Sequence, residues 1–285
     1  MNVAAEPDKD LTGAQSVDRA LKLLSLVGRQ AERGMPLSEI VEQSGFNKPT
    51  TRRLLLALIR AGLVEQDPVE RRYYIGEEAY VLGSLASRRY GLLQLSMESL
   101  IRISRKTEDS SFLSVRRDTY SVCLYREEGT FPIRTHALQA GFEHPLGVGA
   151  GSLAMLSALP DDEIEIVLDQ NASVLREKYP LLQPEQLRRE VAATRERGYA
   201  VNPGLIYASS WGLGIVIRFP DGKLAGALSI AAIDSRMQEA RQVELSKILR
   251  EEAAKVEAKL VDMFAEKGKA REAAILGPSS RRSSR

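Results

Sequence analysis

Residues 36–72 read PLSEIVEQSGFNKPTTRRLLLALIRAGLVEQDPVERR. This stretch predicts two helices joined by a tight turn and followed by a β-hairpin. We expect Ser38 to cap the first helix and Gly45 to end it, because glycine adopts the left-handed conformation without a steric penalty. Asn47 is expected to cap the second helix, with Pro49 in its first turn, where a missing N–H costs little.

The second predicted helix has an apolar back and a basic front when successive residues are placed about 100° apart. The apolar arc consists of Thr51, Leu54, Leu55 and Leu58, and the opposite arc of Pro49, Arg52, Arg53 and Arg60. Between Asn47 and Arg60 the chain carries four basic residues and no acidic one. Such a face suits the major groove of DNA, because arginine binds phosphates and guanine edges, and threonine binds phosphates or the thymine methyl group.

The predicted hairpin forms a wing beside this helix. It turns at Asp67-Pro68 and places Arg71 and Arg72 where they can contact backbone phosphate. The candidate DNA-binding residues are therefore Asn47, Lys48, Pro49, Thr50, Thr51, Arg52, Arg53, Arg71 and Arg72. The alternative is an ordinary helical hairpin with solvated arginines, since many packed helix pairs share the pattern.

The composition of the chain sets wider limits. Its 285 residues predict about two domains, and 44% hydrophobic with 27% charged residues is typical of a globular, soluble chain. Because the net charge is only +2, a nucleic-acid site must come from local clustering. The single cysteine, Cys123, excludes an internal disulfide, and with only two histidines no zinc ligand set is expected. There is no long apolar run and no signal peptide, so we expect a cytoplasmic protein without a membrane span.

Further helices are predicted on both sides of the central stretch. A helix over residues 14–30 completes an N-terminal domain of residues 14–76, and a linker helix over residues 77–91 follows. Residues 1–13 and 266–285 are expected to be disordered tails. The apolar positions assigned to the core of the first helix are Val17, Leu21, Leu24 and Val27. Those of the linker, Val81, Leu82 and Leu85, are assigned either to a core or to a dimer seam. A dimer is expected because a small winged domain that reads a palindrome needs a partner.

The second half of the chain changes toward a hydrophobic period of two, which predicts antiparallel strands. The predicted strands are residues 112–115, 120–125, 133–138, 211–219 and 224–231. The predicted helices are residues 152–158, 161–169, 184–197 and 235–265. Strands paired with segregated helices make an α+β domain over residues 92–265.

A glycine-rich loop at residues 147–151 precedes a short apolar helix in this domain. Its N–H groups and the helix N-terminus can hold a carboxylate, and small residues let a ligand approach the backbone closely. The alternative, left open, is that the glycines only permit a tight turn. The candidate ligand-binding residues are Gly149, Ala150, Asn202, Ser210, Trp211 and Ser229. Arg134 and His136 are interpreted either as surface residues or as partners for an anion.

Catalytic motifs are weak by comparison. The glycines at 147, 149 and 151 lack the sixth-position glycine and the parallel βαβ context of a dinucleotide site. Ser152 has no nucleophile elbow around it, and no order of serine, histidine and aspartate stands out. We therefore expect no catalytic residues, no cofactor and no metal.

Several segments resemble the IclR family of bacterial transcriptional regulators. These are SVDRALKLLSLV, LSEIVEQSGFNKPTTRRLLLALIRAGLVEQD, RRYYIG, HPLGVGAGSLAMLSALP, RERGYAV and GALSIAA, and they span about residues 14–264. The resemblance implies a winged helix-turn-helix followed by a GAF-like domain that binds small organic acids or aromatic catabolites. It also implies dimers or tetramers on palindromic operators, and pocket positions at Gly149, Ala150, Asn202 and Ser229. The chain departs from the family at Gly151-Ser152-Leu153, where Gly-Lys-Ala is usual, so the effector is not implied.

The expected function is a DNA-binding transcriptional regulator with no enzymatic step, which responds to a small-molecule effector. Its expected partners are double-stranded operator DNA, the effector and further copies of the chain. Two alternatives stay open: a small-molecule enzyme whose helix-turn-helix is nonfunctional, and an interaction scaffold whose winged domain binds protein.

Overall fold

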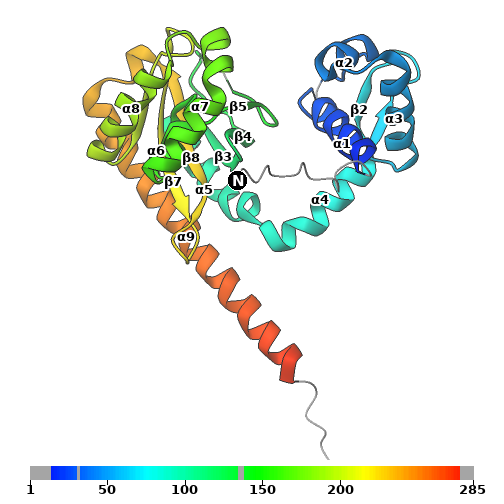
Figure 1. Cartoon of the computed structure of the whole chain (residues 1–285). Coiled ribbons are helices and arrows are strands. Elements are labelled where there is room, and N and C mark those ends of the chain that lie inside the picture. The colour runs from blue at the N-terminus through cyan, green and yellow to red at the C-terminus, as the bar shows by residue number, and fades with distance from the viewer. Residues whose placement is uncertain (1–13, 31–32, 134–137, 277–285) are drawn as a thin grey trace, which may run out of the picture. The chain divides into compact units, whose positions relative to one another are not determined.

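A computed structural model describes residues 14–30, 33–133 and 138–276 (Figure 1). The chain divides between Tyr90 and Gly91 into two compact units. The interpretations of Arg134, His136 and residues 1–13 and 277–285 fall outside the described residues. Within the described residues, none of the helices combines the length and the apolar character needed to cross a membrane.

The N-terminal unit is a winged helix-turn-helix, as predicted. Its elements are α1 (Gln15–Gly28), α2 (Leu37–Ser44), α3 (Lys48–Arg60), β1 (Val64–Gln66), β2 (Tyr73–Ile75) and α4 (Glu77–Tyr90). A small apolar core holds the three helices and the hairpin together, with Leu23, Ile40, Leu55, Val64 and Tyr73 among its buried members. β1 and β2 pair in an antiparallel register that sets Val64 opposite Ile75.

The turn between α2 and α3 forms as its residues predict. Gly45 ends α2 at a φ of 73°, in the left-handed region that favours glycine. The Asn47 side-chain oxygen accepts the backbone N–H of Thr50 at 2.9 Å and so caps α3. The expectation for Ser38 was wrong: α2 begins at Leu37 with Pro36 as its N-cap, so Ser38 lies inside the first turn and makes no cap.

The predicted inward face of α1 was wrong at two positions. Val17 and Leu21 are 57% and 51% exposed, whereas Val27 is buried and Leu24 packs against the core, as predicted. In α4, Val81, Leu82 and Leu85 are exposed in one copy of the chain, so they do not belong to the core of this unit and the alternative of a dimer seam stays open. Helical spacing locates an apolar stripe but does not say which of two adjacent stripes the tertiary contacts will cover.

The C-terminal unit is built on a six-stranded sheet with the order β5-β4-β3-β8-β7-β6, in which every neighbouring pair is antiparallel. The strands are β3 (Ser110–Arg117), β4 (Tyr120–Glu127), β5 (Glu143–Pro145), β6 (Ala200–Pro203), β7 (Ser210–Arg218) and β8 (Leu224–Ile233). The helices are α5 (Leu92–Thr107), α6 (Ala150–Ser157), α7 (Asp161–Lys178), α8 (Pro184–Arg197) and α9 (Glu239–Leu276), with a 3₁₀ turn at Asp234–Arg236. The α+β prediction is therefore confirmed.

Helices cover both faces of this sheet (Figure 1). One apolar core lies between the sheet and α5 and α9, and includes Leu100, Ile215 and Leu249. A second core lies under α6, α7 and α8, and includes Met155 and Leu168. The central strands β7 and β8 contribute apolar side chains to both cores, because helices cover both faces of the sheet there.

Three predicted boundaries in this unit need correction. Ile133 and Leu138 lie outside strands, and the edge strand of the sheet is instead β5. Helix α7 continues to Lys178, well past residue 169. Helix α9 continues to Leu276, so residues 266–276 are helical rather than part of a disordered tail. The composition AEKGKAREAAIL explains the last correction, since alanine, glutamate, lysine and arginine have high helix propensities.

A buried carboxylate joins α5 to α9. Glu252 is 5% exposed, and its carboxylate accepts hydrogen bonds from Nη2 of Arg102 at 2.8 Å and from Nζ of Lys255 at 2.7 Å. Burial by itself raises the pKa of Glu252, but hydrogen bonds from Arg102, Lys255 and Ser99 outweigh burial and lower this pKa from 4.5 to about 2. The ionised carboxylate therefore stabilises the folded state.

We expect Glu252→Gln to lower the free energy of unfolding by about 3 kcal/mol near neutral pH. Because the folded-state pKa lies below 4.5, this contribution is present above about pH 4.5 and is lost as the pH falls toward about 2. Unfolding measured at about pH 7 and about pH 3 should show a smaller difference between wild type and variant at the lower pH. The control is Glu98→Gln, whose carboxylate is 68% exposed and whose removal should change little. Equal stability of wild type and Glu252→Gln at about pH 7 would contradict this expectation.

Candidate functional site

The front of α3 presents an uncompensated basic face. Lys48, Pro49, Arg52 and Arg53 are exposed and Thr50 is half-buried. Within the part of the chain that the structure describes, Lys48, Arg52 and Arg53 make no hydrogen bond and no ion pair, and α3 contains no acidic residue. The guanidinium groups are therefore available to an external polyanion.

Thr51 was predicted to bind DNA, but the structure does not place it on this face. Its side chain is fully buried, and its hydroxyl donates to the backbone oxygen of Asn47 at 3.1 Å. It belongs with Leu54, Leu55 and Leu58 on the buried arc of α3. A threonine that can satisfy its hydroxyl within its own helix is free to take a core position, so its side chain does not reach outward.

The two wing arginines differ in their surroundings. Arg71 is exposed at a φ of 60° in the hairpin turn and makes no side-chain hydrogen bond to the described residues. Arg72 is half-buried, and its guanidinium donates to the backbone oxygens of Arg33 and Gly34 at 3.3 and 3.1 Å. Arg72 therefore ties the wing to the loop before α2, and Arg71 is the freer cation.

Two cations that the sequence analysis missed flank the turn between α2 and α3. Arg19 and Lys22 of α1 lie 5.5 and 5.2 Å from the ring centre of Phe46. Lys22 also donates to the backbone oxygen of Ser44 at 3.0 Å. The spacing of Arg19 and Lys22 by three residues can be read from the sequence and places both on one face of α1. Their position beside Phe46 depends on tertiary packing, which the sequence pattern does not show.

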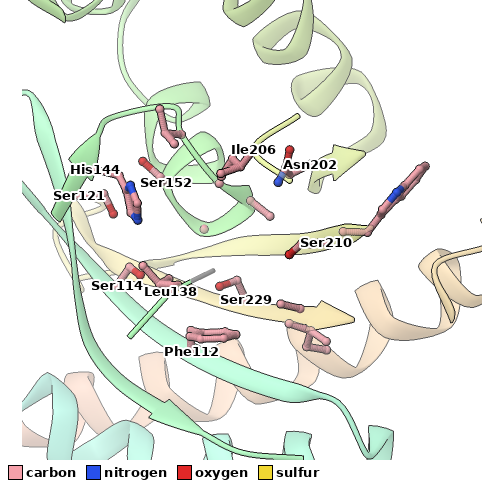
Figure 2. A pocket seen from close by; sticks show the side chains of 18 residues that line it. Phe112, Ser114, Ser121, Leu138, His144, Ser152, Asn202, Ile206, Ser210 and Ser229 are labelled. Atoms are coloured by element: carbon pink, nitrogen blue, oxygen red, sulfur yellow. The ribbon is translucent and has the colours of Figure 1, made fainter. Parts of the chain in front are cut away.

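A pocket in the C-terminal unit lies between the sheet and the N-terminus of α6 (Figure 2). It contains about 590 Å³ of empty space, including space open to solvent. All six residues predicted to bind a ligand line it, namely Gly149, Ala150, Asn202, Ser210, Trp211 and Ser229. The structure thus brings together positions from the glycine loop and from three strands.

Glycines on both elements allow α6 to lie directly on the sheet. A Cβ atom at Gly214 of β7 would lie 2.5 Å from the backbone oxygen of Ala150, and one at Gly151 would lie 3.0 Å from Oγ of Ser229. Gly149 precedes the helix at a φ of 88°, a conformation that favours glycine. These glycines therefore do more than permit a turn: they set the first turn of α6 against β7 and β8.

The polar groups of the pocket are largely without protein partners. Ser114, Ser121, Ser210 and Ser229 are each at most 8% exposed, yet their hydroxyls make no hydrogen bond to the described residues. The backbone N–H groups of residues 150–152, at the start of α6, also have no acceptor within the described ranges. Hydrogen-bonding groups that line a pocket and have no protein partner are available to a ligand, so this arrangement is typical of a binding site.

Two other polar residues of the pocket mainly shape its walls. The Asn202 side-chain oxygen accepts the N–H of Leu205 at 3.1 Å, and Asn202 lies in β6 rather than in a turn. Oγ of Ser152 accepts the N–H of Gly147 at 2.9 Å and so closes the glycine loop. Ser152 therefore has a structural role in this loop.

Further lining residues were not assigned to the pocket from the sequence, and these include Phe112, Ser114, Ser121, His144 and Ile206. The alternation of Phe112 and Ser114 on β3 was a visible signal, because alternate residues of a strand share a face. His144 could not be placed, since the strand β5 that carries it is only three residues long.

The pocket wall is uncharged in the described part of the chain, because none of its lining residues is Asp, Glu, Lys or Arg. Burial lowers the pKa of His144, which favours the neutral imidazole. Burial also raises the pKa of the nearby Cys123 thiol to about 12, which keeps this thiol protonated. Within the described residues, no group of three His, Cys, Asp or Glu side chains is placed to hold a metal ion.

A basic winged helix joined to a domain with a ligand pocket defines the class of ligand-responsive transcriptional regulators. The model for the IclR helix-turn-helix domain matches residues 16–68, and that for the bacterial transcriptional regulator IclR C-terminal domain matches residues 85–258. The chain therefore belongs to the IclR family, and it is an IclR-type helix-turn-helix regulator with a C-terminal effector domain.

Individual relatives are similar over most of their length. KipR of Bacillus subtilis is 24% identical over 246 residues, which cover 86% of this chain and 97% of KipR. The transcriptional repressor IclR of Escherichia coli is 26% identical over 189 residues, 65% of this chain and 68% of that repressor. A crystal structure of a putative IclR regulator from Silicibacter has a TM-score of 0.74 at 26% identity and covers 86% and 96% of the two chains. An IclR homolog from Microbacterium hydrocarbonoxydans, complexed with 4-hydroxybenzoate, has a TM-score of 0.69 at 22% identity over 87% and 99%.

Proposed function

We propose that this regulator binds palindromic operator DNA as a dimer or tetramer, and that a small organic acid or aromatic catabolite in the C-terminal pocket controls it. One observation carries the second half of the proposal. Among the described residues, serine hydroxyls and the N–H groups at the start of α6 have no protein partners, and the side chains that line the pocket there carry no charge. A helix N-terminus favours an anion, and the hydroxyls supply additional donors for a carboxylate.

The proposed DNA face consists of Asn47, Lys48, Pro49, Thr50, Arg52, Arg53, Arg71 and Arg72. Arg52 and Arg53 are proposed to read or position the major groove, and Arg71 to contact backbone phosphate. Asn47 and Arg72 are proposed to act mainly by holding α3 and the wing in place, because their side chains already bind the protein backbone. A protein-binding scaffold has no need of a cationic face that lacks acidic neighbours.

Support for an oligomer comes from apolar residues that one copy of the chain leaves uncovered. Tyr80, Leu82 and Leu85 on α4 are 76%, 49% and 63% exposed. A second copy that covered them would also supply the second reading head that a palindromic site requires.

Purified protein and promoter fragments from the neighbouring genes test both halves of the proposal. Thermal unfolding is measured with a panel of organic and aromatic acids, because a ligand that binds only the folded state raises the melting temperature. Trp211 is the single tryptophan of the chain and lines the pocket, so its fluorescence should change with the same acids. DNA affinity is then measured with and without the active acid, since regulation requires unequal binding to two states. Turnover of any acid would favour the enzyme alternative instead.

We expect Arg71→Gln to weaken binding to all DNA sequences alike and to reduce the salt slope of binding by about one. A phosphate contact carries no sequence information, and glutamine keeps a similar side chain in the hairpin turn without its charge. Fluorescence anisotropy over a series of salt concentrations, on operator and on random DNA, measures both quantities. An unchanged slope would show that Arg71 does not contact phosphate.

A further inference from the structure

The pocket has a second polar end. Figure 2 shows His144 and Ser121 close together at one end of the cavity, whereas Asn202 and Ser210 lie toward the other. Ser121 and His144 are direct partners in the antiparallel pairing of β4 and β5. Directly paired residues lie on the same face of a sheet, so this end of the pocket presents a hydroxyl and an imidazole side by side.

A tyrosine from outside the pocket wall fixes the imidazole. Nδ1 of His144 lies 2.7 Å from the phenolic oxygen of Tyr179, which follows α7. The two rings also meet edge to face, with centroids 6.0 Å apart and planes at 73°. One ring nitrogen is therefore occupied, and Nε2 makes no hydrogen bond to the described residues.

The protonation states of His144 and Tyr179 favour a neutral hydrogen-bonding group of the ligand beside the imidazole. Burial raises the pKa of the Tyr179 phenol, and proximity to Tyr207 and Tyr120 adds to this, so the phenol keeps its proton. Nε2 of His144 then donates or accepts according to the tautomer of the ring. A hydroxyl group satisfies either tautomer, because it both donates and accepts. A second carboxylate would lack a positive partner among the described residues of the wall.

Resting on the acid-binding role proposed above, we propose that His144 recognises a hydroxyl group of the effector, at the end of the molecule remote from its carboxylate. Tyr179 acts as a positioning residue that holds the imidazole. Apolar side chains of Phe112, Val148 and Ile206 line the pocket as well and contact the body of the ligand. The effector is therefore a hydroxylated carboxylic acid with an apolar body.

The proposal predicts discrimination rather than affinity alone. A ligand that lacks the hydroxyl would cover Nε2 of His144 and the hydroxyl of Ser121 without giving them partners, which costs binding free energy. We expect the hydroxylated member of a matched pair to bind at least about tenfold more tightly than its parent acid. Variation at His144 should remove this ratio, whereas general damage to the pocket would weaken both members together.

The test uses full-length protein and three matched pairs of probes: benzoate with 4-hydroxybenzoate, 3-phenylpropionate with 3-(4-hydroxyphenyl)propionate, and butyrate with 4-hydroxybutyrate. Affinities are measured by Trp211 fluorescence and by calorimetry. The variants are His144→Phe, which removes both ring nitrogens, and Tyr179→Phe, which removes only the phenolic oxygen. Tyr199→Phe is the matched control, because Tyr199 does not line the pocket and its hydroxyl makes no hydrogen bond to the described residues.

We expect at least one pair to show the tenfold preference in wild type and in Tyr199→Phe. The ratio should fall to about one in His144→Phe and to an intermediate value in Tyr179→Phe. Parent acids that bind as tightly as their hydroxylated partners in wild type, or a ratio that survives His144→Phe, would overturn this inference and leave the acid-binding role intact. Failure of every probe to bind wild type would overturn both.

Discussion

Replacement of Gly214 by valine is expected to abolish effector binding and to lower the stability of the C-terminal domain. A Cβ atom there would lie 2.5 Å from the backbone oxygen of Ala150 and 2.8 Å from the nitrogen of Gly151. Backbone cannot rotate away as a flexible side chain can, so the first turn of α6 must move off the sheet. Overpacking of this kind costs about 3 kcal/mol, or roughly 6–12 °C in melting temperature for a domain of this size.

The functional loss should exceed the loss of stability, because the displaced turn carries the N–H groups proposed to hold the carboxylate. Binding is measured by Trp211 fluorescence with the acid that gives the largest thermal shift in wild type. Ile215→Val is the matched control: it alters the adjacent residue of β7, which packs on the opposite face, and should cost only about 0.5–1.5 kcal/mol. If Gly214→Val bound that acid as tightly as wild type does, the α6 turn would not be part of the site.

Part of the pocket, including the glycine loop at residues 147–151, could be predicted from the sequence. The glycine loop was assigned because small residues beside a helix start are a local signal. Asn202 and Ser229 were assigned because they match pocket positions of the family that the sequence resembles. His144 and Ser121 were not assigned, because their pairing depends on a three-residue edge strand. An element that short has no periodicity of its own, and only the finished sheet defines it.

The N-terminal unit was predictable to a greater extent, for a related reason. The turn between α2 and α3 depends on single residues whose backbone conformation or capping role is specific, such as Gly45 and the cap Asn47. The position of Thr51 was less certain, because a threonine fits both an exposed polar face and a buried position that satisfies its hydroxyl. Apolar residues that one copy leaves uncovered, such as Leu21 and Leu85, also could not be assigned to an inner or an outer face from their spacing.

Replacement of both Arg52 and Arg53 by alanine is expected to remove specific operator binding. Each base contact by an arginine contributes about 1–3 kcal/mol, so the pair contributes roughly 2–6 kcal/mol, or about thirtyfold to ten-thousandfold in affinity. Both side chains are exposed and make no contact with the described residues that alanine would break. Alanine also has the highest helix propensity, so α3 should remain folded.

A matched double variant separates this effect from a general loss of charge. Arg105 and Lys106 are exposed at the end of α5 in the other domain, and Arg105→Ala with Lys106→Ala removes the same two charges. Anisotropy at equal salt should show wild-type affinity for this control and the large loss for the α3 variant. If the loss is uniform over all sequences and the salt slope falls by about two, the arginines bind phosphate rather than bases. If both double variants bind the operator as wild type does, the front of α3 is not the surface that contacts DNA.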